Sequence, residues 1–138
     1  MDSPIVTLHR YYIWANKMRT HFYELLENKE KIKSEKFNIE AVMYMSLWYA
    51  SLYVVIEGWQ ALKLKDERID ELLQSENVAL LKRYRNGVFH FQKVYKDKRF
   101  DEFDQKKEAA EWMVKLNKEF GRYFLQELSD KGAIPAVL

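Results

Sequence analysis

The sequence predicts an all-α protein that folds as an up-and-down bundle of four to five helices. The 138 residues include only four glycines and two prolines. A strand-rich fold with many tight turns would be expected to contain more of both. No segment alternates apolar and polar residues between turn clusters, whereas apolar residues recur at helical spacing. Hydrophobic residues form 48% of the chain, and no repeat or linker divides it. We therefore expect one domain, residues 1–138, with 133–138 as either a loose tail or a segment that docks on a neighbour.

The first helix is expected from Ser3-Pro4 to about Asn28, because serine caps helices well and proline suits the first helical position. The charged run KEKIKSEK then forms a connection, and Asn38 is expected to cap a second helix that ends near Leu64. Residues 41–56 of that helix carry no charge. This uncharged stretch is shorter than the roughly 20 apolar residues of a membrane span. They indicate a core helix, or one shared with a second subunit, rather than a membrane segment.

The second half of the chain contains three further helical segments. A short turn of helix is expected at 66–74, and Ser75 is placed to cap a third helix that continues to Tyr95. A last long helix is predicted from about Asp104 to Leu128, and Gly132 and Pro135 stop it. Its apolar side consists of Ala110, Met113, Leu116, Phe120 and Phe124.

Composition and spacing exclude several kinds of chemistry. The chain has no cysteine, and no two of its three histidines stand four residues apart, so neither thiolate nor simple helical zinc sites are expected. No histidine follows a glutamate by three residues, as carboxylate di-iron bundles require, and no phosphate-binding glycine loop is present. We expect no metal and no cofactor, and His9 and His21 read as ordinary helix residues. The first residues lack the layout of a secretion signal, which favours the cytoplasm.

Positive charge is concentrated in residues 82–99, where seven Lys and Arg residues stand against the single acid Asp97. On a helical wheel at about 100° per residue, this segment separates two faces. One face is apolar and is expected to enter the core; it consists of Val78, Leu81, Tyr84, Val88, Phe91 and Tyr95. The opposite face gathers Lys82, Asn86, His90 and Lys93. Such a face is either a binding surface for a polyanion or a solvated helix exterior.

Three residues on or beside this face suit the chemistry of a phosphodiester. Arg85 offers a planar fork of donors to phosphate oxygens, and His90 can exchange a proton near neutral pH with a ribose 2′-OH or a leaving oxygen. Asn86 can hold His90 or bond the phosphate, and Gly87 would let a strand or a partner helix approach. Lys82, Arg83, Lys93 and Phe89 are the candidate RNA-binding residues. The alternative is that Arg85 and His90 pair with acids on adjacent helices.

The string Arg85-Asn86-Gly87-Val88-Phe89-His90, late in a small helical chain, resembles the HEPN superfamily and its Arg-x(4 to 6)-His motif. The resemblance implies a homodimer in which two motifs face each other across a cleft, so that Arg85 of one copy complements His90 of the other. It also implies a metal-independent endoribonuclease, acting as a toxin or in abortive infection against phage, with a cognate antitoxin protein as partner.

Glu57 ends the uncharged run, and the resemblance makes it the candidate for a further polar residue of the site. It either orients Arg85 or is an exposed carboxylate near a helix end. In the leading hypothesis, His90 is the general acid or base and Arg85 stabilises charge on the phosphoryl oxygens, with Asn86 as the orienting residue. Two other hypotheses stay open: a non-catalytic module that binds RNA or protein through the same face, and a structural subunit whose aromatic second helix docks a partner.

Overall fold

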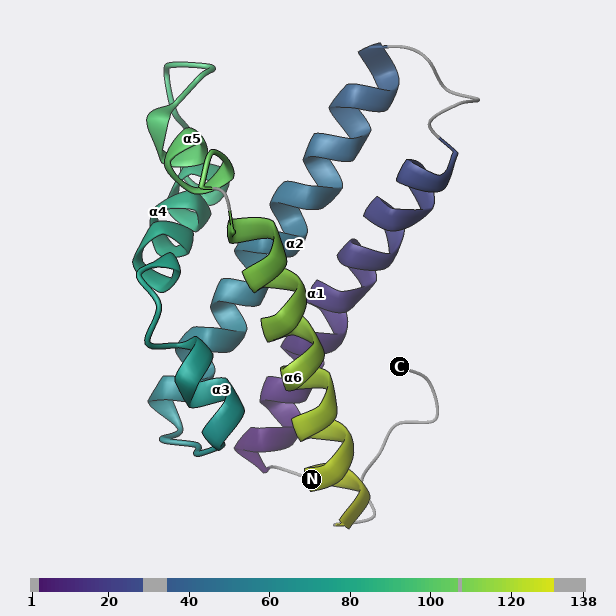
Figure 1. The fold of residues 1–138 in the computed structure, drawn as a ribbon. Coiled ribbons are helices and arrows are strands. Elements are labelled where there is room, and N and C mark those ends of the chain that lie inside the picture. The colour runs from purple at the N-terminus through teal and green to yellow at the C-terminus, as the bar shows by residue number, and fades with distance from the viewer. Residues whose placement is uncertain (1–2, 29–34, 107, 131–138) are drawn as a thin grey trace.

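The computed structural model describes residues 3–28, 35–106 and 108–130, and these residues form helices and loops without a strand (Figure 1). The all-α prediction is confirmed. The helices are α1 (Pro4–Glu27), α2 (Glu35–Ala61), α3 (Glu67–Leu72), α4 (Asn77–Phe89), α5 (Lys98–Asp104) and α6 (Ala109–Asp130). The four longer ones, α1, α2, α4 and α6, run alternately up and down the bundle (Figure 1). The described part therefore has one helix more than predicted, namely α5.

The first two helices form an antiparallel pair at the centre of the molecule (Figure 1). α1 has the predicted limits: Ser3 precedes it in an extended conformation, Pro4 opens it, and the Asn28 N–H bonds the Leu25 carbonyl at its end. The Ser3 side chain makes no capping hydrogen bond, so the predicted serine cap was wrong. α2 begins at Glu35, before Asn38, so the prediction that Asn38 caps this helix was wrong. Glutamate and lysine are good helix formers, and this preference allows the helix to start earlier.

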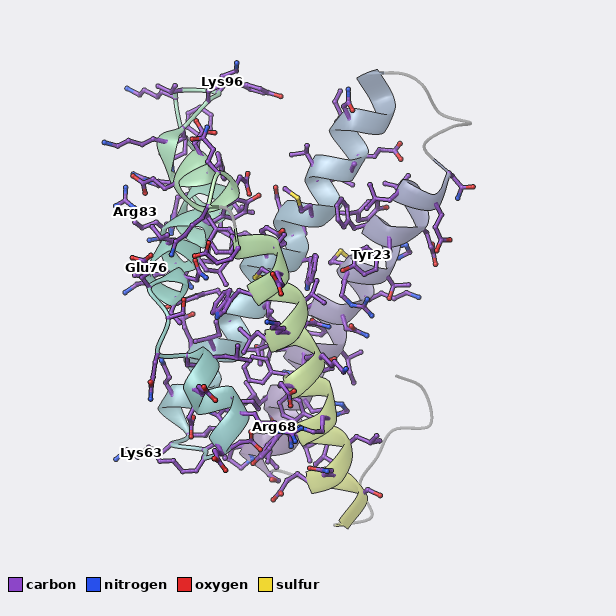
Figure 2. The ribbon with its side chains drawn as sticks, viewed as in Figure 1. Tyr23, Lys63, Arg68, Glu76, Arg83 and Lys96 are labelled. Carbon is purple, nitrogen blue, oxygen red and sulfur yellow. The ribbon has the colours of Figure 1, made fainter. Side chains whose placement is uncertain are left out.

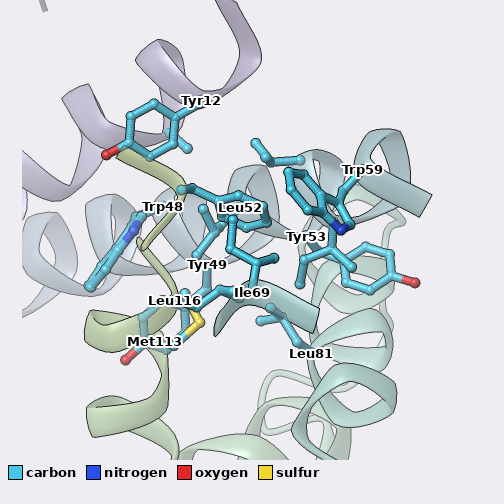
Figure 3. Close-up of a cluster of buried hydrophobic side chains, with 14 of the residues drawn as sticks. Tyr12, Trp48, Tyr49, Leu52, Tyr53, Trp59, Ile69, Leu81, Met113 and Leu116 are labelled. Carbon is cyan, nitrogen blue, oxygen red and sulfur yellow. The ribbon is translucent and has the colours of Figure 1, made fainter. Parts of the chain in front are cut away.

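The apolar middle of α2 supplies much of the core. Its inner side chains pack against aromatic and aliphatic groups of the other helices (Figure 3); among them Trp48, Leu52, Val55, Ile56 and Trp59 are buried. By length and composition alone, the segment Asn38–Ala61 could also cross a membrane. In the bundle 44% of its most apolar window is buried, while Ile39, Val42 and Met43 near its start are exposed.

Two aspartates begin the short helices. Asp66 accepts hydrogen bonds from the Arg68 and Ile69 backbone N–H groups and starts α3, close to the predicted 66–74. Asp97 accepts a hydrogen bond from the Arg99 N–H and starts α5. A side-chain oxygen in this position satisfies amides that have no partner inside the helix.

The last helix begins later than predicted. α6 starts at Ala109, while Asp104, its predicted first residue, is the last residue of α5. Ala109 is buried and Ala110 is exposed, so placing Ala110 on the apolar side was wrong; Met113, Leu116, Phe120 and Phe124 are buried as expected. Gly132, Pro135 and the predicted tail 133–138 lie outside the described residues.

A buried polar centre connects α6 with α1 and α2. The backbone carbonyl of Asn117 accepts a hydrogen bond from the Tyr12 hydroxyl at 3.2 Å, and its side-chain carbonyl accepts one from the Trp48 indole N–H at 3.3 Å. The Asn117 amide donates to Oδ1 of Asn16 at 3.1 Å. Each polar atom at this junction has a partner from another helix, which fixes the three helices against one another.

Candidate functional site

The helix that carries the motif is shorter than its periodicity predicts. α4 begins at Asn77, whose N–H bonds the Ser75 hydroxyl at 3.0 Å, so Ser75 satisfies a first-turn amide as expected. The helix ends at Phe89, and His90 has an extended backbone with φ −120° and ψ 129°. The prediction of a helix continuing to Tyr95 was therefore wrong.

Arg85 is held from three sides within the described structure. Its Nη1 donates to Oε1 of Glu57 on α2 at 2.7 Å, and its Nε donates to Oδ1 of Asn86 at 3.0 Å. Its guanidinium carbon lies 4.9 Å from the centre of the Tyr53 ring, a distance typical of a cation–π contact. The side chain is 18% exposed. Arg85 is thus a fixed cation at the junction of α2 and α4.

Glu57 makes the contact that the sequence suggested, from a half-exposed position. It lies one turn before the end of α2, and its side chain is 45% exposed while it bonds Arg85. Burial raises the pKa of Tyr53 beside this pair, the Glu57 carboxylate raises it further, and the Arg85 charge opposes both effects. Tyr53 therefore stays a neutral phenol under the guanidinium. Sequence reasoning missed Tyr53, although it stands four residues before Glu57 on one helix face.

His90 stands at the end of α4 with its side chain exposed. Its backbone N–H bonds the Asn86 carbonyl at 3.0 Å, and its carbonyl accepts a hydrogen bond from the Gln92 side chain at 2.7 Å. In the described part of the chain, no hydrogen bond or ion pair joins the imidazole to Arg85 or to an acid. His90 is therefore open to solvent, and the alternative of pairing with a neighbouring acid is seen for Arg85 alone.

The candidate RNA-binding residues do not share one helix face. Lys82 is exposed on α4, and Lys93 is exposed in the loop beyond the helix end. Arg83 forms a two-point ion pair with Glu102 of α5, at 2.6 and 3.2 Å, so much of its charge is already balanced. Figure 2 shows Arg83 on the outer side of α4. Phe89 is exposed at the last turn of the helix.

Gly87 faces the protein interior rather than a ligand. A Cβ at this position would lie 3.0 Å from Cε1 and Cζ of Phe100, which belongs to α5 of the same chain. The glycine is buried, so its predicted role in admitting a nucleic-acid strand was wrong. It lets α5 pack closely against α4.

Phe91 and Tyr95 were predicted in the core, but they are 91% and 93% exposed. Because α4 ends at Phe89, the helical wheel does not describe where the side chains of Phe91 and Tyr95 point. The signal for the break was Asp97, a good helix cap followed by Phe100 and Phe103 at helical spacing. These residues predict a new helix rather than an extension of α4.

The other two histidines occupy structural positions. His9 is buried against the rings of Tyr12 and Phe124, and this burial lowers its pKa. His21 stacks on Tyr44 and lies 3.7 Å from Glu24. Across residues 3–28, 35–106 and 108–130, no group of three His, Asp or Glu side chains is arranged to hold a metal ion.

Comparisons with protein family models, with curated proteins and with solved structures find no match to this chain. The likeness to the HEPN superfamily therefore stays a prediction from the motif.

Proposed function

We propose that this protein is a metal-independent endoribonuclease of the HEPN type. The observation that supports the proposal most is that the last two turns of α4 and the residue after it carry a fixed guanidinium, Arg85, and an exposed imidazole, His90. Glu57, Asn86 and Tyr53 hold Arg85 in place, and His90 is open to a substrate five residues later. A preorganised cation suits the stabilisation of charge that develops on a phosphoryl group, and a solvent-open imidazole suits proton transfer.

The chemistry needs no group beyond the chain and the RNA. The neutral imidazole of His90 takes the proton of a ribose 2′-OH, whose oxygen then attacks the adjacent phosphorus. The bond from phosphorus to the 5′-oxygen breaks, and a protonated imidazole returns a proton to that oxygen. The products are a 2′,3′-cyclic phosphate and a 5′-hydroxyl. Arg85 stabilises the charge on the non-bridging oxygens, and Asn86 maintains its orientation.

A homodimer would bring Arg85 of one copy to His90 of another, and would also supply two imidazoles in different protonation states. An open groove of about 570 Å³ between α1 and α2 offers an apolar surface, and it is lined by Leu8, Tyr11, Val54 and, at its edge, Glu57. Trp14 is exposed on α1. In the wider proposal this dimer is a cytoplasmic toxin or anti-phage effector held in check by an antitoxin protein. Light scattering tests the dimer directly.

The test of the enzyme is incubation of purified protein with RNA in excess chelator, followed by analysis of the new ends. We expect cyclic-phosphate ends from the parent and none from His90→Ala, which should fold normally because His90 is exposed. His21→Ala is the matched control, since it removes a histidine away from the motif. The enzyme proposal would be wrong if the parent left RNA intact, or if His90→Ala cut RNA as well as the parent.

A second candidate is a non-catalytic RNA- or protein-binding module. It is favoured by one observation: the charge of Arg85 is already paired with Glu57, and no interaction in the described residues connects Arg85 with His90. RNA binding that weakens steeply with salt, without any product, would select this function.

A further inference from the structure

The loop between α4 and α5, residues 91–97, exposes aromatic side chains to an unusual degree. Phe91 and Tyr95 are 91% and 93% exposed, and Val94 between them is also exposed. Burying one such ring typically contributes about 2 kcal/mol. Single exposed apolar residues are ordinary on protein surfaces, but two nearly free rings and a valine on one short loop indicate a surface that binds something.

The same loop is cationic. Lys93 and Lys96 in the loop, and Lys98 at the first position of α5, are exposed, and none of them forms an ion pair with the residues that the structure describes. The acid of the loop, Asp97, is occupied, because it caps α5 and lies 3.8 Å from the Arg99 side chain. Lys96 lies at the tip of the loop, at the outer end of the bundle (Figure 2). A ligand of the loop therefore meets rings and uncompensated positive charge together.

The position of the loop connects it with the candidate site. It begins directly after His90, and the Gln92 side chain bonds the His90 carbonyl at 2.7 Å. A polymer bound along the loop would lead to the imidazole.

We propose that the 91–97 loop binds single-stranded RNA, with Phe91 and Tyr95 stacking on bases and Lys93 and Lys96 contacting phosphates. This inference rests on the proposed function and names the form of RNA that the site takes. Bases stack on exposed rings only where they are not already paired in a duplex, which selects single strands. Stacking tolerates every base, so little sequence preference is expected. Protein interfaces are depleted in lysine at their centres, so two unpaired lysines on the same loop as the rings favour the nucleic acid.

The test measures binding of a fluorescent 2′-O-methyl oligonucleotide of about 12 nucleotides, which lacks the attacking hydroxyl and cannot be cut. The double variant Phe91→Ala, Tyr95→Ala should bind the strand about tenfold more weakly or worse. Leu125→Ala, an exposed apolar change on α6 away from the loop, is the matched control and should stay within about twofold. Lys93→Ala with Lys96→Ala should lower the salt dependence of log K by about 1.4, since each phosphate contact contributes roughly 0.7 on single strands.

Two further ligands separate stacking from charge. An abasic strand of equal length keeps the phosphates, so the parent and the ring variant should bind it equally and weakly. A duplex of the same sequence should show no ring effect. Equal affinity of parent and ring variant for the ordinary strand would overturn the inference. So would ring-dependent binding to vesicles containing anionic lipid in a protein that does not bind the strand, which would make the loop a membrane contact.

The outcomes distinguish this inference from the proposed function. If the parent cuts RNA and the ring variant binds and cuts equally well, the loop inference fails and the enzyme proposal stands. If the ring variant loses binding to the ordinary strand and the parent yields no cyclic-phosphate ends, the loop inference stands and the enzyme proposal fails. Circular dichroism of each variant checks that the exposed substitutions leave the fold intact.

Discussion

Nη1 of Arg85 on α4 lies 2.7 Å from Oε1 of Glu57 on α2, so an ion pair connects the motif helix to the central helix pair. The contact has two consequences. It fixes the direction of the guanidinium, and it offsets part of the positive charge that a phosphate would meet. The same pair therefore supports an orienting role for Glu57 and sets a limit on how strongly Arg85 attracts an anion.

The first prediction concerns the energy of this pair. Combining Glu57→Ala and Arg85→Ala in a double-mutant cycle should give a coupling of about 1 kcal/mol in the free energy of unfolding, because Glu57 is partly screened by water. Urea unfolding of the four proteins measures it. Lys82→Ala, an exposed cation on the same helix, is the control and should show no coupling with Glu57→Ala. A coupling near zero for the Arg85 cycle would mean that Glu57 does not hold Arg85 in solution.

The second prediction concerns the close contact of Gly87 with Phe100. Alanine is favoured over glycine inside a helix by about 1 kcal/mol, but its Cβ would lie 3.0 Å from the Phe100 ring. In a Phe100→Ala background, Gly87→Ala should raise the free energy of unfolding by about 1 kcal/mol. In the parent, Gly87→Ala should raise the free energy of unfolding by less than this, or lower it. An equal gain in both backgrounds would show that the ring does not constrain position 87.

The third prediction concerns Asp104, at the carboxyl end of α5. Partial desolvation of the Asp104 carboxyl raises its pKa to about 6, and the nearby Asp101 charge adds to the effect, although the residue as a whole is exposed and solvent screens part of it. Because the folded-state pKa lies above the unfolded value, ionisation of Asp104 costs stability as the pH rises from about 4 through 6. Asp104→Asn should therefore be more stable than the parent near neutral pH, by about 1 kcal/mol or less because water reaches the side chain, and equally stable near pH 4. Thermal unfolding at both pH values tests this, and a gain of equal size at both would contradict it.

The fourth prediction concerns the buried His9. Burial lowers its pKa below the unfolded value, so the unfolded chain binds more protons, and stability falls as the pH drops below about 6.5. His9→Phe, which keeps a ring against Tyr12 and Phe124, should flatten this dependence between pH 7.5 and 5. Parallel pH profiles for the parent and His9→Phe would be inconsistent with this cause.

Local signals in the sequence predicted the beginning of the fold well. Ser3-Pro4 predicted the start of α1 and Asn28 its end, and the position of the short helix α3 was also predicted. Glu57 could be named because it interrupts a long uncharged run, and the structure places it against Arg85. In each case the information is local: Pro4 at the start of α1, the Asp66 cap of α3, or a break in hydrophobicity at Glu57.

The length of α4 could not be predicted from periodicity. Val88, Phe91 and Tyr95 fit helical spacing, yet the chain leaves the helix at His90 because Asp97 starts α5, which packs Phe100 against Gly87. The contact between Phe100 and Gly87 is a tertiary contact that favours ending α4 at Phe89. A helical wheel describes one helix alone and contains no information about such a contact. The same error placed Lys93 and His90 on a helix face and hid the exposed rings.

The junction at Asn117 also limits how the bundle can rearrange. One residue of α6 accepts bonds from a phenol on α1 and an indole on α2 through two different carbonyl oxygens. Sliding α6 along its neighbours by a single turn would leave the two donors and the amide without these partners at a largely buried junction. The hydrogen bonds of Asn117 thus favour the observed helix alignment over a shifted one that would bury a similar apolar area. Asn117 therefore helps to fix the register of α6 in the bundle.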